Sequence, residues 1–362
     1  KGSYDRFIAK NYDELIDSPI EIGNHKIYSF ECRGATHEYA ITSTGNIDTN
    51  IIIEDSKKIV KEIQSLFDDK PPYNHYIFFL HLTNNSFGGL EHCNSCSMIY
   101  DRNGFKNRKK YLRFLGLVSH EFFHTWNVKR IRPKELGPFD YYNEVYTKLL
   151  WIAEGVTSYY DNLFLARSNV ATIEEYFEII CNDLKRYENT PGKDMMTVED
   201  SSFDAWIKLY RPNENSINTS ISYYLKGGLI IMALDLTIRD ITNGEKSLDH
   251  VYQKLWIKYK DDKKGIDDLL FKGYCEDIAG QKLNHIWNYL NTTTPLNIND
   301  YLRPFGVELN TGYSSVEKEE MAFFGLIIRK NTTEIANTIA NTSSHEEGLN
   351  AGDEIIAIND SR

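Results

Sequence analysis

Two histidines and a glutamate in residues 119–127, which read SHEFFHTWN, have the spacing of a metal site. On an α-helix, residues four positions apart lie on one face, so His120 and His124 can both direct a ring nitrogen toward one ion. Glu121 projects beside that ion, where a carboxylate can polarise a bound water. The alternative is a core helix that contains histidines by chance, because short motifs recur in unrelated sequences.

The residues around the histidine pair favour a metal site. The segment is rich in large apolar side chains, so we expect a buried helix, and a buried histidine without a partner is costly. A catalytic zinc also needs a third protein ligand and an open position for water. The next acid in an apolar, helical setting is Glu154, within LLWIAEGVTSYY. We expect Glu154 to be the third ligand rather than a partly exposed acid on a helix surface.

The periodicity of apolar residues predicts the elements that position this group. Strands are predicted within residues 28–44, at 76–82 and, as one strand entered through two glycines, within 88–100. Helices are predicted at residues 56–67, 111–127, 143–166, 172–187, 223–241, 248–259 and 281–290. The chain therefore reads as an α/β part that gives way to a helical part near residue 165.

The last sixty or so residues change character again. Residues 322–329 (AFFGLIIR) and 354–358 (EIIAI) read as strands with a tight Ala-Gly-Asp turn between them. We expect three domains, at residues 1–165, 166–303 and 304–362.

Composition narrows the classes of partner. The net charge of −11 and pI near 5.5 argue against nucleic acid. The 41% hydrophobic and 26% charged residues are typical of a soluble globular protein. No apolar run reaches the ~18–20 residues that a membrane span needs. Residues 1–30 lack a signal peptide, but we expect the natural N-terminus to lie upstream. The compartment, whether cytoplasmic, periplasmic or secreted, therefore stays open.

HEFFHTWNVKRIRP followed by LWIAEGVTSYY resembles the glycyl aminopeptidase family, metallopeptidase family sixty-one, whose members are PDZ-bearing relatives of aminopeptidase N. The resemblance extends to DSPIE at residues 17–21, GGLEH at 88–92 and the segment 202–240. It implies an α+β fold with a thermolysin-like zinc peptidase lobe, an α-helical lobe and a C-terminal PDZ-like β module that is incomplete here. The N-terminal β-domain of the family is absent from this sequence.

The resemblance implies roles for the residues of the metal site. His120, His124 and Glu154 would ligate one zinc ion, and Glu121 would be the general base. A tyrosine in a Tyr-x-Lys-Gly segment donates to the oxyanion in aminopeptidase N relatives. Tyr224 matches that segment, whereas Tyr223 lies one position out of register.

GGLEH occupies the place of the exopeptidase motif of aminopeptidase N. Gly88 and Gly89 would let a substrate backbone approach a strand edge closely. Glu91 would pair with the α-ammonium group of the substrate. His92 belongs to the same substrate-binding segment, although the sequence gives it no defined role.

The leading hypothesis is a zinc-dependent aminopeptidase that removes small N-terminal residues, such as Gly or Ala, from peptides with a free N-terminus. A zinc endopeptidase of the same fold is the first alternative, and Glu91 favours the aminopeptidase over it. A second alternative is an inactive PDZ-bearing protein that binds peptides. A complete PDZ domain would take a peptide or protein partner.

Overall fold

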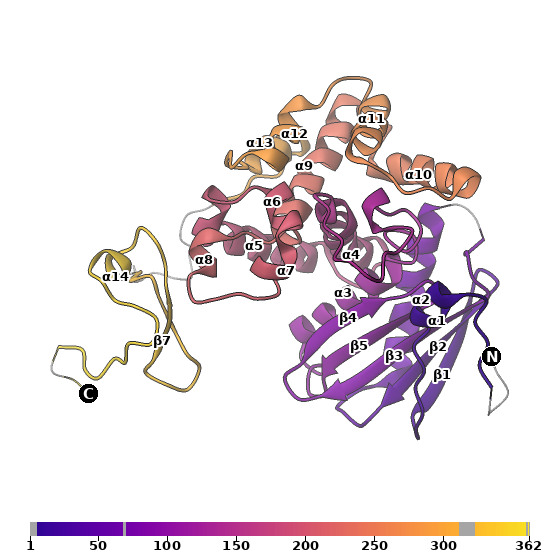
Figure 1. The fold of residues 1–362 in the computed structure, drawn as a ribbon, viewed down its shortest axis with the longest axis horizontal. Helices are drawn as coiled ribbons and strands as arrows, with labels where there is room; N and C mark the ends of the chain where they lie inside the picture. The colour runs from indigo at the N-terminus through magenta and orange to yellow at the C-terminus, as the bar shows by residue number, and fades with distance from the viewer. Residues whose placement is uncertain (1–5, 68–69, 311–322, 360, 362) are drawn as a thin grey trace. The chain divides into compact units, whose positions relative to one another are not determined.

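The structure is a computed structural model that describes residues 6–67, 70–310, 323–359 and 361. It is a mixed α+β protein (Figure 1) that divides into two compact units, each built from separate stretches of the chain. The first unit comprises Lys1–Val145, Val156–Cys181 and Lys246–Ile278, and the second comprises Tyr146–Gly155, Asn182–Glu245 and Ala279–Arg362. The three domains expected from the sequence stay a prediction.

A five-stranded sheet forms the first unit, in the order β1-β2-β3-β5-β4 (Figure 1). The central strands β2, β3 and β5 run parallel, and the outer strands β1 and β4 pair antiparallel to them. Parallel strands are usually covered on both faces, and the β3 side chains Tyr76, Phe78 and Leu80 are fully buried. The strands are β1 (Lys26–Cys32), β2 (Ala35–Thr42), β3 (His75–Thr83), β4 (Phe87–Glu91) and β5 (Ser95–Asp101).

The GGLEH segment differs from its prediction. The single strand predicted within residues 88–100 is wrong, because the segment forms two strands, β4 and β5, that pair as a hairpin. Its turn is closed by a hydrogen bond from the His92 backbone N–H to the Ser95 carbonyl oxygen, 2.9 Å long. Glu91 is therefore the last residue of a strand at the edge of the sheet.

Helix α3 (Arg108–Phe123) is the buried helix of the first unit. It starts where the Asn107 side chain accepts a hydrogen bond from the Lys110 backbone N–H, 3.1 Å long. The side chains of Phe114, Val118 and Phe122 are fully buried, as the apolar pattern predicts. Helices α2 (Thr49–Leu66) and α4 (Val156–Arg167) pack against α3. The remaining helices of this unit are α1 (Tyr12–Ile16), η1 (Lys134–Leu136), α10 (Leu248–Asp262) and α11 (Asp268–Ala279), together with the first half of α5 (Ile173–Glu188).

Two helix boundaries around the histidine pair differ from the sequence prediction. Helix α3 ends at Phe123 instead of residue 127, and His124 is its C-terminal cap. The backbone N–H of His124 still donates to the His120 carbonyl oxygen at 3.2 Å, so the last helical turn retains the spacing of the pair. The helix predicted at 143–166 starts only at Trp151, with the π-helical turn η2 (Trp151–Gly155) that continues directly into α4.

Helix α9 (Leu225–Ile241) is the core helix of the second unit, with Ile230, Leu234 and Ile238 fully buried. The other helices are α6 (Val198–Phe203), α7 (Ala205–Lys208), α8 (Ser216–Thr219), α12 (Asn284–Asn291), α13 (Asn299–Leu302) and α14 (Ser343–Glu346), with 3₁₀ turns η3 (Pro191–Asp194) and η4 (Arg303–Phe305). Among all described residues, no helix combines the length and apolar character needed to cross a membrane.

The described C-terminal residues contain a two-stranded sheet. Strand β6 (Leu326–Ile328) lies within the predicted segment 322–329, whose first residue, Ala322, is outside the described residues. It pairs antiparallel with β7 (Ile335–Thr338). The strand predicted at 354–358 is wrong, because this segment makes only isolated bridges, between Glu334 and Glu354 and between Ile358 and Ser361. The PDZ-like assignment stays a prediction.

A backbone-to-backbone contact joins η2 to α9 within the second unit. A Cβ atom added to Gly155 would lie 2.8 Å from the carbonyl carbon of Gly227 and 2.9 Å from its Cα. Only glycine allows the π-helical turn to approach α9 this closely. The contact brings the segment that carries Glu154 next to the segment that carries Tyr224.

Replacement of Gly155 by alanine is expected to lower the free energy of unfolding by about 1–3 kcal/mol, the usual cost of overpacking. Backbone atoms of Gly227 cannot rotate away from the new methyl group. Gly273 of α11 is a matched control, because an added Cβ there has nothing within 4 Å. Gly273→Ala should be neutral or slightly stabilising. Urea unfolding measures both variants, and wild-type stability of Gly155→Ala would contradict the close contact.

Candidate metal centre

His120 and His124 extend from the last turn of α3 with their ring centroids 4.6 Å apart. The His124 side chain is almost fully buried, and that of His120 is 13% exposed. The two rings lie at an interplanar angle of 86°. The helix therefore brings the two imidazoles together, as the spacing in the sequence predicts.

Hydrogen bonds determine which nitrogen each histidine presents. The Nδ1 atom of His124 lies 2.7 Å from the carbonyl oxygen of Asn127. A carbonyl oxygen only accepts, so Nδ1 carries the proton and Nε2 keeps its lone pair. The Nδ1 atom of His120 lies 3.0 Å from Oδ2 of Asp161, and an ionised carboxylate likewise accepts. Nε2 is therefore the nitrogen through which each histidine would ligate a metal.

Glu154 completes a three-residue group. One ligand atom from each of His120, His124 and Glu154 lies within 4.8 Å of the other two, and within the described part of the chain no second group of three such residues meets this criterion. Glu154 lies in the π-helical turn η2, which continues into α4, and α4 packs on α3. Isolated π-helical turns are frequent at functional sites. Two imidazoles and one carboxylate fit a catalytic zinc that keeps an open position.

Glu121 lies against the edge strand of the sheet. Its side chain is 4% exposed. A Cβ atom added to Gly89 would lie 2.0 Å from Oε1 and 2.2 Å from Cδ of Glu121, whereas one added to Gly88 would meet only Ile99, at 3.6 Å. Gly89 therefore has a role that the sequence did not predict, since it makes room for the Glu121 carboxylate.

Glu91 and Glu121 both act electrostatically on the thiol of Cys96, which pairs with Glu91 in the hairpin. Burial first, and then the negative charges of Glu121 and Glu91, raise the pKa of this thiol well above its ordinary value. The predicted base lies against Gly89, and the predicted amine-binding carboxylate follows Gly89 by two residues in the same strand. His92 follows Glu91, and its side chain is 10% exposed.

Tyr224 immediately precedes α9 in the second unit. Its hydroxyl oxygen lies 3.5 Å from that of Tyr210, and its ring stacks on that of Tyr223 with centroids 4.8 Å apart. Burial and the charge of Glu154 raise the pKa of Tyr224 far above its usual range, so the hydroxyl stays a donor. Glu154 also raises the pKa of Tyr223, but there burial and Tyr210 contribute more.

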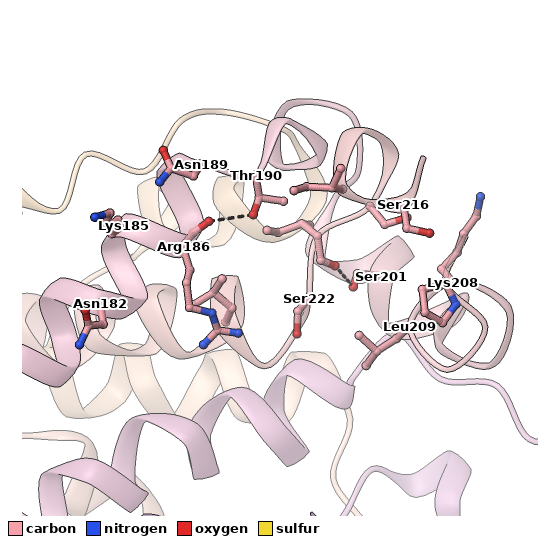
Figure 2. A pocket seen from close by; sticks show the side chains of 15 residues that line it. Asn182, Lys185, Arg186, Asn189, Thr190, Ser201, Lys208, Leu209, Ser216 and Ser222 are labelled. Atoms are coloured by element: carbon pink, nitrogen blue, oxygen red, sulfur yellow. Dashed lines mark hydrogen bonds between the residues drawn. The ribbon is translucent and has the colours of Figure 1, made fainter. Parts of the chain in front are cut away.

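A cavity of about 720 Å³ lies beside the segment that carries Tyr224 (Figure 2). Ser222 and Leu225, on either side of Tyr223 and Tyr224, are among the residues that line it. The Ser201 hydroxyl donates a hydrogen bond to the carbonyl oxygen of Ile221 at the cavity wall (Figure 2). Ser201 thereby fixes the backbone just before the tyrosine pair.

Two residues absent from the sequence prediction, Asp161 and Asn127, bond to the candidate histidine ligands. Asp161 is seven positions after Glu154, two helical turns along, so a search for a second acid on the same helix face could have found it. Asn127 acts on His124 through its backbone carbonyl, which no sequence pattern indicates. Its side chain donates to Thr157 Oγ1 and accepts from the Tyr252 hydroxyl, both at 3.0 Å. The Asn127 carbonyl is therefore held in place from α4 and α10.

Comparisons with known proteins agree with the family resemblance. Residues 113–230 match the family described as M61 glycyl aminopeptidase. A solved aminopeptidase N family protein from Idiomarina loihiensis is 32% identical with a TM-score of 0.90, and the match covers 96% of this chain and 62% of that one. This chain therefore spans less than two thirds of that protein. A search of curated proteins finds no match.

Two further solved structures share the fold alone. An M1 zinc metallopeptidase from Deinococcus radiodurans is 13% identical with a TM-score of 0.50, and the match covers 76% of this chain and 54% of that one. Aminopeptidase A from Legionella pneumophila, in complex with aspartic acid, is 16% identical with a TM-score of 0.50 over 74% of this chain and 28% of that one.

Gly89→Ala should remove any catalysis that uses Glu121 as a base, a loss of about 10²–10⁴-fold in turnover. The added methyl group displaces the end of a flexible side chain, so metal content and thermal stability should stay close to wild type. Gly273→Ala is the control, because an added Cβ there has nothing within 4 Å, and it should retain turnover. If Gly89→Ala were as active as Gly273→Ala, Glu121 would not act from its observed position.

Asp161→Asn should weaken zinc binding by about 10–100-fold, because partners that orient ligating histidines have effects of this size. Competition with a chelator measures the affinity. Asp277→Asn changes an exposed carboxylate that pairs with Lys254 and serves as the control. Equal zinc affinity of the two variants would show that Asp161 does not orient His120.

Proposed function

We propose that this chain, a member of the M61 glycyl aminopeptidase family, is a zinc-dependent aminopeptidase that removes N-terminal residues from peptides. The observation that carries the proposal is the convergence of His120, His124 and Glu154. The position of Glu121 against Gly89, at the start of the GGLEH segment, supports it.

Zinc would be held by Nε2 of His120, Nε2 of His124 and a carboxylate oxygen of Glu154, and when bound it would lower the pKa of a water and polarise the scissile carbonyl. Glu121 accepts the proton of the attacking water and later transfers it to the leaving amine. The 4% exposure of Glu121 supports this role, because a poorly hydrated carboxylate has few competing waters.

Tyr224 donates a hydrogen bond to the oxygen on which negative charge develops. Its place directly before α9, which the Gly155–Gly227 contact brings next to the segment of Glu154, supports the role. After burial, Glu154 is the largest cause of the raised pKa of Tyr224, whereas Tyr210 precedes Glu154 for Tyr223, which supports the choice between the two. One such donor contributes about 10²–10³-fold to the rate.

Glu91 binds the α-ammonium group of the substrate and thereby restricts cleavage to the first peptide bond. Its place at the end of the edge strand whose Gly89 lies against Glu121 supports this role over internal cleavage. The family match supports small N-terminal residues such as Gly or Ala.

Peptides with free and with acetylated N-termini should separate the aminopeptidase from an endopeptidase of the same fold. Wild-type protein loaded with zinc should cleave the free peptide after its first residue and leave the acetylated one intact. Glu91→Gln should lower kcat/KM for the free peptide roughly 10- to 100-fold, since a charge-assisted hydrogen bond is worth about 1.5–3 kcal/mol. Glu121→Gln should retain zinc and lose turnover. Internal cleavage of acetylated peptides at the rate of free ones would contradict the proposal.

A further inference from the structure

Asp17 lies between the turn that follows Glu91 and the segment that leaves the histidine helix. Asp17 is the C-terminal cap of helix α1, and its own backbone N–H donates a hydrogen bond to the Asp13 carbonyl oxygen. Its side chain is 18% exposed. All of these segments belong to the first unit.

The Asp17 carboxylate uses both oxygens. Oδ2 accepts a hydrogen bond from the backbone N–H of Cys93, 2.8 Å long, in the turn of the β4–β5 hairpin. Oδ1 lies 2.6 Å from Nζ of Lys129 and 3.4 Å from Nδ1 of His92. One carboxylate therefore joins the turn after Glu91 to a lysine five positions beyond His124.

Arg130 holds the other side of the same turn. Its Nη1 donates to the carbonyl oxygen of Cys93 at 3.0 Å and to that of Thr125 at 2.6 Å. Thr125 directly follows His124 in the chain. The N–H of Cys93 is thus bound by Asp17 and its C=O by Arg130, and both connections lead to the end of α3.

Charge stabilises these contacts. Burial alone would raise the pKa of Asp17, but His92, Lys129 and the Cys93 amide outweigh it and hold the pKa well below its usual range. Asp17 is accordingly ionised at neutral pH. Charged partners strengthen hydrogen bonds to backbone groups, so the turn is held more firmly than neutral side chains would hold it.

We infer that Asp17, Lys129 and Arg130 form a clamp that sets the position of Glu91 relative to the metal ligands. The inference rests on the proposed function, in which Glu91 binds the α-ammonium group one residue away from the scissile bond. A displacement of about 1 Å at such a site can cost 10²-fold in rate. The three residues act through the turn that follows Glu91, so they are positioning residues. His92 supplies a third contact to Asp17, which gives it a structural role.

Asp17→Asn tests the clamp, with Asp13→Asn as the matched control. Asp13 lies in the same helix, is exposed and accepts a hydrogen bond from the Tyr141 hydroxyl at 2.6 Å. Asp17→Asn should keep its zinc, raise KM for a free-amine tripeptide about 10- to 100-fold and change kcat less. The preference for free over acetylated peptides should narrow in parallel. Asp13→Asn should behave as wild type.

Hydrogen exchange gives a readout that does not depend on activity. Backbone amides in residues 91–96 should exchange faster in Asp17→Asn than in wild type or Asp13→Asn, because the Cys93 N–H loses a charged acceptor. Asp17→Ala, Lys129→Ala and the double variant complete the test. The KM increases of the two single variants should not multiply in the double variant, because both remove the same ion pair.

Wild-type exchange in residues 91–96 of Asp17→Asn would overturn the clamp, whatever the activity. Faster hydrogen exchange in Asp17→Asn with unchanged KM and unchanged preference for free peptides would show that the clamp does not position Glu91. If exchange rose but wild-type protein cleaved acetylated peptides as well as free ones, the contacts of the clamp would be supported and the aminopeptidase proposal would fail.

Discussion

The orientation of two imidazole rings is the constraint on which the rest of the candidate centre depends. A helix alone brings His120 and His124 to one face, but it leaves either nitrogen of each ring free to face an ion. The Asn127 carbonyl and the Asp161 carboxylate bind the Nδ1 atoms and leave both Nε2 atoms for a ligand. Helix α3 therefore has to end just after His124, so that the chain can turn and return the Asn127 carbonyl to the ring.

Two glycines allow close contacts around this centre because they carry no side chain. Gly89 leaves space for the Glu121 carboxylate against strand β4, and Gly155 lets the turn with Glu154 meet α9. Their substitutions have different expected consequences because different atoms are in the way. At Gly89 the obstacle is a side chain that can rotate, so function should suffer before stability. At Gly155 it is a backbone that cannot rotate, so packing itself should suffer.

The sequence predicted the parts of the fold that depend on local patterns. The burial of α3 and the strands β1 to β3 follow from apolar periodicity. The histidine pair and Glu154 were chosen from spacing and setting, and the structure brings their ligand atoms together. The remaining roles of the candidate residues stay predictions.

The structural features that the sequence did not predict depend on contacts between distant segments of the chain. Residues 88–100 divide into a hairpin at the turn that contains Cys93. Asp17 and Arg130 bind the backbone of Cys93, although they lie 76 and 37 positions from it in the sequence. The turn that starts at Trp151 is π-helical and packs Gly155 on Gly227, a contact between distant segments of the chain. The apolar segment 354–358 has the composition of a strand, but among the described residues it makes only two isolated bridges, to Glu334 and to Ser361.

Anomalous X-ray scattering at the zinc absorption edge, on crystals of the whole chain grown with zinc, tests the central claim most directly. The account predicts one strong peak at about 2.0–2.2 Å from Nε2 of His120, Nε2 of His124 and a carboxylate oxygen of Glu154. The Nδ1 atoms should keep their bonds to Asp161 and Asn127. No peak among these three residues at full zinc loading, or a peak bound through Nδ1, would contradict it.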